Sequence, residues 1–168
     1  MVTIRPATAG DVPALAELAR RTWSDAFGAS VDPADEAAEL ERTRSPAYFA
    51  EALRDRTILV AEAEGRLVGY VQLGDVEIPE VDVQPGDQSL QRIYVDAAAQ
   101  GRGLGRRLLD AALEHRRLRG ASRVFLTVWE QNERAVCLYE SAGFRRCGTT
   151  TFAIGSEVVE DLVMVRES

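Results

Sequence analysis

The chain of 168 residues has no lysine, one histidine, two cysteines and no long hydrophobic run. All 20 basic residues are arginine, which excludes Schiff-base chemistry and a GxxxxGK[ST] phosphate loop, because both need a lysine. A lone His115 excludes a multi-histidine metal site, and Cys137 and Cys147 match no zinc spacing. We therefore expect no metal, and reduced thiols in a cytoplasmic protein.

The composition is that of a globular protein with an acidic charge balance. Hydrophobic residues make up 46% of the chain and the formal net charge is −7. No apolar run approaches the ~20 residues of a membrane span, and the N-terminus lacks the apolar segment of a signal peptide. General nucleic-acid binding requires a basic surface, which an acidic protein does not favour. We expect one domain over residues 1–168, no membrane association and no nucleic-acid partner.

Strand and helix patterns alternate along the chain and predict a single α/β domain around a mixed sheet. Strands are expected over 2–5, 57–62, 66–73, 89–95, 123–129, 144–151 and 157–165. Helices are expected after Asp11, over 32–44, from Pro46 to Leu53, from Gly103 to about Arg119, and from Asn132 to Gly143. The spacing of the fourth of these helices places His115 on its packed face.

The most informative stretch is a set of alternating glycines, Gly101, Gly103 and Gly105, between a predicted strand and a predicted helix. Glycines let backbone N–H groups turn toward one point, and a helix N-terminus adds unpaired donors and partial positive charge. With Arg102, Arg106 and Arg107 beside them, they suit a phosphate group. A plain glycine turn and a dinucleotide site are the alternatives, although GxGxxG lacks its third glycine here.

The loop pattern (Arg or Gln)-x-x-Gly-x-(Gly or Ala), here residues 100–105, resembles the acyl-CoA pyrophosphate loop of the GNAT N-acetyltransferase superfamily. Residues 126–144 are similar to the family's second hallmark, a strand, an Asn, a small residue, a Tyr and a closing Gly-Phe. Asn132, Ala135 and Tyr139 occupy these positions and share one helical face. The resemblance implies the GNAT fold, one domain with a mixed, mostly antiparallel central sheet flanked by helices, and acetyl-CoA as cosubstrate.

The resemblance also assigns roles to individual residues. Backbone N–H groups of the strand at residues 93–95 would hold the acetyl carbonyl and the pantetheine arm, and Tyr139 would protonate the CoA sulfur as the catalytic acid. Asn132 also suits a helix N-cap and Tyr139 a core aromatic, so each has a structural alternative. The expected cofactor-binding residues are Ile93, Tyr94, Val95, Gln100, Gly101, Arg102, Gly103, Leu104, Gly105, Arg106, Asn132, Ala135 and Tyr139.

The group that takes the proton from the attacking amine stays open. Relatives often have a glutamate just before the Arg-Ile-Tyr stretch of this strand, where this chain has Gln91, which is not a useful base. The proton would pass to water or to an acid of the preceding segment, namely Glu77, Glu80 or Asp82.

Charge is unevenly distributed around the glycines. Residues 67–91 contain five acids and no arginine, whereas residues 92–123 contain eight arginines and three acids. The arginines suit the CoA phosphates and the acids suit a cationic amine, although acidic surface loops are also ordinary in a protein of this net charge. Residues 91–96, 129–135 and 161–164 are similar to bacterial spermine/spermidine N-acetyltransferases. This implies a polyamine as the small-molecule substrate, with Glu77, Glu80 and Asp82 as the acids that bind it.

Other functions stay open at this point. One is acetylation of a protein N-terminus or of another small amine. The other is a non-catalytic, CoA-binding regulatory domain, which Tyr139 disfavours and Gln91 allows. The terminal pair of strands could pair between subunits, as in many relatives, so a homodimer is possible.

Overall fold

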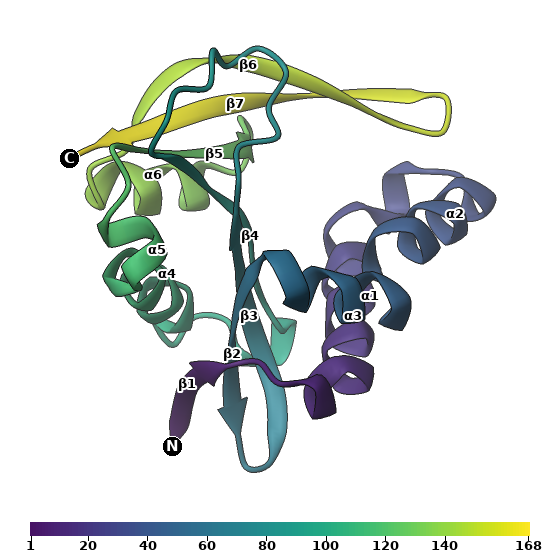
Figure 1. Ribbon diagram of the computed structural model, residues 1–168. Helices are drawn as coiled ribbons and strands as arrows, with labels where there is room; N and C mark the ends of the chain where they lie inside the picture. Colours follow the sequence, from purple (N-terminus) through teal and green to yellow (C-terminus); the bar gives the residue numbers. More distant parts are fainter.

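The computed structural model describes all residues, 1–168, and its centre is one seven-stranded sheet in the order β1-β2-β3-β4-β5-β7-β6 (Figure 1). The strands are β1 (Val2–Pro6), β2 (Thr57–Ala63), β3 (Arg66–Gly74), β4 (Asp87–Val95), β5 (Arg123–Trp129), β6 (Arg145–Ile154) and β7 (Glu157–Glu167). Only β4 and β5 pair in parallel, and all other neighbours are antiparallel. The predicted mixed, mostly antiparallel sheet is thereby confirmed.

Six helices cover the two faces of the sheet. They are α1 (Val12–Phe27), α2 (Pro33–Arg44), α3 (Pro46–Asp55), α4 (Leu104–Glu114), α5 (Arg116–Arg119) and α6 (Glu133–Ser141). Side chains of β2 alternate between the faces, as the period of a strand requires. Val60 packs with Phe49 of α3, and Leu59 belongs to the cluster of Leu108 on the other side. None of the helices combines the length and the apolar character needed to cross a membrane.

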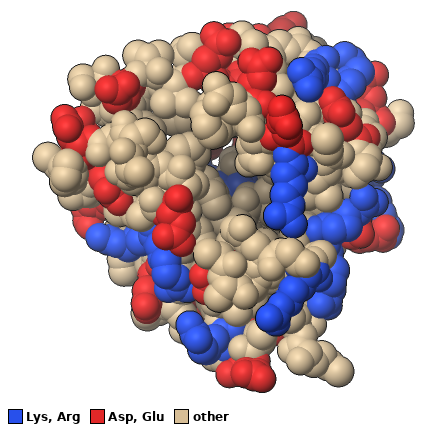
Figure 2. All heavy atoms as spheres, turned by 180° about the vertical axis from the view of Figure 1, so that it is seen from behind, with Lys and Arg blue, Asp and Glu red and all other residues tan.

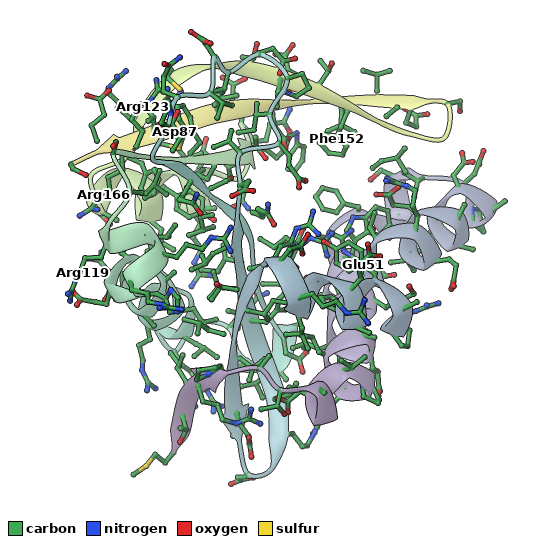
Figure 3. All side chains as sticks on the ribbon, in the orientation of Figure 1. Glu51, Asp87, Arg119, Arg123, Phe152 and Arg166 are labelled. Carbon is green, nitrogen blue, oxygen red and sulfur yellow. The ribbon has the colours of Figure 1, made fainter.

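The parallel pairing of β4 with β5 is short, and this opens the sheet. The register begins at Asp87 with Arg123 and ends at Ser89 with Phe125. At the start, Arg123 Nε donates to Asp87 Oδ1 at 2.9 Å, and the two side chains lie together in Figure 3. Beyond Ser89 the strands no longer pair, so the edge of β4 that faces β5 is free up to Val95. The chain thereby forms a V-shaped opening in the middle of its sheet.

A long hairpin of β6 and β7 reaches from the sheet to the helices α1 and α2 (Figure 1). Its end packs there through a small cluster in which Ile154 is buried with Trp23 and Leu40. The turn carries Gly155 at φ 60°, in the left-handed region that favours glycine. The hairpin therefore closes one side of the opening between β4 and β5.

The expected helix from Gly103 to about Arg119 is wrong at one position. The chain leaves the helical conformation at His115, which has a ψ of 137° and separates α4 from α5. The His115 imidazole accepts a hydrogen bond at Nδ1 from the backbone N–H of Arg117 at 3.2 Å, so it caps the second helix. Helical spacing alone could not show this, because a capping side chain competes with the backbone locally. The half-buried His115 is not on a packed helix face.

Candidate active site

A cleft of about 1320 Å³ occupies the opening between β4 and β5. One part, the glycine-loop end, is lined by residues 93–95, 100–106 and α6. The other part, the helical end, is lined by α1 to α3, the side chains of β3 and β4 that face these helices, and the β6–β7 hairpin. Figure 2 shows a central hollow from behind, with basic side chains visible inside it. Figure 3 shows Phe152 extending from the hairpin at the helical end.

The glycine-loop end is shaped by backbone conformation. Gly101 and Gly103 have φ values of 79° and 75°, in the left-handed region, and Gly103 directly precedes α4. A Cβ at either glycine would meet no atom within 4 Å, so the space beside the loop is open. The first N–H groups of α4 have no acceptor within the helix. Open space, free donors and the positive end of a helix dipole fit the pyrophosphate of CoA.

The polar side chains around the loop have distinct positions. Gln100 donates from Nε2 to the carbonyl of Val95 at 3.1 Å and holds the loop against the end of β4. Arg106 lines the cleft, fixed by Asp110 at 3.0 Å and by Ser141 at 2.9 Å. Arg102 is exposed and does not line the cleft. Of the residues predicted to bind the cofactor, the cleft brings together all the others.

Two residues of α6 combine structural and cleft-lining positions. Asn132 caps α6 by accepting at Oδ1 from the backbone N–H of Ala135 at 3.2 Å, and it also lines the cleft. Tyr139 is 6% exposed and packs edge-on against Phe144, with ring centroids 6.0 Å apart. Burial raises the pKa of Tyr139, so the phenol keeps its proton at neutral pH. A protonated hydroxyl in the cleft is the form that a proton donor requires.

The acids expected to bind the substrate do not gather at one place. Glu77 lines the helical end, where its Oε1 pairs with Arg56 at 2.7 Å. Glu80 and Asp82 are exposed and outside the cleft lining. Asp75 of the same segment pairs with Arg117 at 3.1 Å. The acidic character of residues 67–91 is therefore reduced by arginines from other parts of the chain.

Gln91 is held by its neighbours rather than free to act. Its Oε1 accepts from Gln72 Nε2 at 2.9 Å, and its own Nε2 donates to the carbonyl of Asp75 at 3.0 Å. This amide contributes no group that could take a proton.

Asp161 of β7 is a cleft residue that the sequence reasoning did not assign to the site. It lines the cleft, and its carboxylate forms neither an ion pair nor a hydrogen bond. Burial raises the pKa of Asp161 to about 6. One signal was present in the sequence, because Asp161 lies on the same face of a strand as the apolar Val159 and Val163.

Four polar residues of the helical end were also missed. They are Arg44, Tyr48, Gln72 and Arg92, which come from α2, α3, β3 and β4 and meet in the cleft. No spacing links them, because they are brought together only by the packing of α1 to α3 on the sheet.

Comparison with known proteins identifies the family of this chain. The model of the Acetyltransferase (GNAT) family matches residues 12–144. The chain belongs to this family. GNAT enzymes transfer acetyl groups from acetyl-CoA to nitrogen, and this GNAT acetyltransferase has the fold for that reaction.

Three known proteins are similar to this GNAT acetyltransferase in sequence or in structure. An uncharacterized N-acetyltransferase of Mycobacterium tuberculosis is 36% identical over 159 residues, which is 94% of this chain and 97% of the relative. The spermine/spermidine N(1)-acetyltransferase of Bacillus subtilis is 33% identical over 100 residues, 59% of this chain and 66% of that protein. The crystal structure of PaiA N-acetyltransferase from Thermoplasma acidophilum in complex with coenzyme A has a TM-score of 0.79, with 20% identity over 100% of this chain and 99% of that chain.

Proposed function

We propose that this GNAT enzyme transfers the acetyl group of acetyl-CoA directly to the primary amine of a small molecule, with polyamines such as spermidine as the first candidates. The observation that carries the proposal is one continuous cleft. It joins an open phosphate-binding loop to a helical end that contains the unpaired carboxylate of Asp161.

The attacking amine must first lose a proton. An alkyl amine has a pKa near 10, so keeping it neutral at pH 7 costs roughly 4 kcal/mol. Asp161 is the cleft carboxylate without a partner, since Glu39 pairs with Arg42 at 2.6 Å and Glu77 with Arg56. The ammonium releases this first proton to water, and the neutral amine then attacks. We assign Asp161 as the group that accepts the second proton, which becomes acidic as the nitrogen–carbon bond forms.

The remaining steps use groups of the glycine-loop end. Acetyl-CoA supplies a thioester whose carbonyl carbon the amine attacks. The free edge of β4 at residues 93–95 offers backbone N–H groups to the carbonyl oxygen, where negative charge develops. Tyr139 holds a proton in the same cleft and donates it to the sulfur when the carbon–sulfur bond breaks. No covalent enzyme intermediate is required.

Two observations support polyamines as candidates for the acceptor. Asp161 lines the cleft as a carboxylate without an arginine partner, and it suits a cationic group of the acceptor. The match to the Bacillus subtilis spermine/spermidine N(1)-acetyltransferase covers about three fifths of this chain.

The test is a thiol-release assay with acetyl-CoA and a panel of polyamines, amino acids, aminoglycosides and N-terminal peptides. We expect release of CoA thiol with at least one small primary amine. Turnover with peptides but not with small amines would replace the proposal by protein N-terminal acetylation. Binding of CoA without release for any amine would indicate a non-catalytic CoA-binding domain.

A further inference from the structure

Three buried side-chain polar atoms of the chain have no hydrogen-bond partner, and all three lie together. They are Arg44 Nε, Tyr70 Oη and Gln72 Oε1. Tyr70 stacks on Tyr94, with ring centroids 5.8 Å apart, and the Arg44 guanidinium lies 5.9 Å from the same Tyr94 ring. Because a buried polar group without a partner costs about 1–3 kcal/mol, three in one place indicate a site rather than an accident of packing.

Arg44 is a buried cation without a counter-ion. It is 6% exposed, lines the cleft and forms no ion pair with any carboxylate. The rings of Trp23 and Tyr94 lie 5.8 Å and 5.9 Å from its guanidinium carbon. Its Nη1 donates to Thr43 Oγ1 at 2.6 Å. These contacts fix the guanidinium plane but supply no negative charge, and burying a charge unpaired is strongly unfavourable.

Arg92 brings a second guanidinium to the same place. Its Nη1 donates to the backbone carbonyl of Thr43 at 2.9 Å, so both arginines are tied to one residue. Its guanidinium carbon lies 4.6 Å from the centroid of the Tyr48 ring. Arg92 also lines the cleft and has no carboxylate partner. Burial raises the pKa of Tyr70, and the charges of Arg44 and Arg92 act against this rise.

We infer that Arg44 and Arg92 form a binding subsite for an oxyanion of the acceptor, so that the preferred amine also carries a carboxylate or phosphate group. A guanidinium presents its N–H donors in a planar fork that matches such oxyanions in two-point contacts. The unpartnered Nε of Arg44, a residue of the cleft lining, is the donor left for it. The subsite rests on the proposed transfer to a small primary amine, and it disfavours polyamines among the acceptors, because a polyamine has no anionic group and meets two positive charges here.

Matched pairs of acceptors test the subsite. The thiol-release assay compares 4-aminobutanoate with butylamine, and O-phosphoethanolamine with ethanolamine, so that each pair differs in the anionic group. We expect kcat/KM to be at least about 10-fold higher for the anionic member of one pair, because charge-assisted hydrogen bonds contribute about 1.5–3 kcal/mol. The pair that shows the preference distinguishes a carboxylate from a phosphate.

Two variants separate binding of the anion from structural support. R44M and R92M remove the charges and keep unbranched side chains. We expect the ratio of kcat/KM for the anionic to the neutral acceptor to fall at least about 10-fold in each, with KM for acetyl-CoA unchanged. A purely structural role would lower kcat/KM for both acceptors in proportion and leave the ratio unchanged. Arg20 of α1, which does not line the cleft, provides the control R20M, for which the ratio stays at the wild-type value.

Direct binding keeps the subsite distinguishable from catalysis. Calorimetric titration of the CoA complex with 4-aminobutanoate, O-phosphoethanolamine and putrescine should show binding of an anionic compound that R44M abolishes. Turnover of polyamines without binding or turnover of either anionic amine would overturn the subsite and leave the proposed function intact. Anion binding without thiol release for any amine would do the reverse.

Discussion

The two ends of the cleft are built in opposite ways. At the glycine-loop end, the loop itself is a contiguous stretch, residues 100–106, whose shape depends on two left-handed glycines and the start of α4. The helical end comes from α1, α2, α3, β3, β4 and β7, and it depends on side chains that meet through packing. The comparison teaches that the shape of the glycine loop is encoded locally in the backbone, whereas the side chains of the helical end are brought together by long-range contacts.

Removing the proposed proton acceptor of the helical end should have the largest effect on turnover. It should leave binding of acetyl-CoA at the other end unchanged. We expect Asp161→Asn to lower kcat by about 10²–10³-fold, since general bases contribute on this scale, with KM for acetyl-CoA unchanged. Steady-state kinetics with saturating acetyl-CoA measures this. The exposed neighbour Glu160 provides the control Glu160→Gln. Wild-type turnover in Asp161→Asn would remove its assigned role.

The pH profile sharpens the same distinction. Because burial raises the pKa of Asp161 to about 6, the carboxylate is protonated below that pH, and kcat should rise as pH increases through about 6. The folded state also binds this proton more tightly than the unfolded state, whose pKa is near 3.9. Stability from this group is therefore present at low pH and lost as pH rises through about 6.

Asp161→Asn should then be more stable than the wild type at pH 7 while being less active. Thermal unfolding at pH 5 and pH 7 provides the measurement. A variant that is destabilised equally at both pH values would contradict the raised pKa of Asp161.

At the glycine-loop end, Tyr139→Phe should lower kcat by roughly 10–100-fold and leave the Kd of acetyl-CoA unchanged, because only the proton donor is lost. Single-turnover kinetics and equilibrium binding of acetyl-CoA separate the two quantities. Equal loss of binding and turnover would indicate that Tyr139 supports the cleft rather than the reaction.

The backbone of the loop should tolerate side chains poorly. Gly103→Ala places a Cβ at a φ of 75°, which costs about 1–2 kcal/mol, so we expect the Kd of acetyl-CoA to rise about 10-fold. Gly148→Ala is the matched control, because Gly148 has no positive φ and its Cβ would also meet no atom within 4 Å. Equal effects of both variants would show that the loop conformation is unimportant.

The smallest effect on catalysis is expected for a substitution at the start of the β4–β5 pairing, which supports both ends of the cleft. The side chain of Asp87 is 1% exposed and pairs with Arg123 where the pairing of β4 with β5 begins. We expect Asp87→Asn to lower the free energy of unfolding by about 1–3 kcal/mol, with little change in kcat at 25 °C. Arg123 lowers the pKa of Asp87, so this stability is present at neutral pH and lost as pH falls into the acidic range. Urea unfolding at pH 7 and pH 4 tests both statements.

The same contrast explains what the sequence could predict. Apolar periodicity and glycine spacing are local signals, and they predicted the strands, most helices and the glycine-loop end. The charge pattern failed at the helical end because it ignores pairing across the fold. Glu77 meets Arg56, 21 positions away, and Asp75 meets Arg117, 42 positions away. Asp161, Arg44 and Arg92 carry no shared motif, so only the folded chain brings them into one cleft.

The β6–β7 hairpin has a consequence for how this enzyme can change. Its tip touches α1 and α2 through the small cluster of Ile154, Trp23 and Leu40, and Gly155 of the turn lies against Asp35 of α2. The hairpin therefore covers one side of the cleft as a segment whose length can change. Lengthening or trimming it would change the size of acceptor that fits, while the sheet and the glycine loop stay as they are. New acceptor specificities can arise by editing about ten exposed residues around one turn, which is among the least costly changes a protein surface allows.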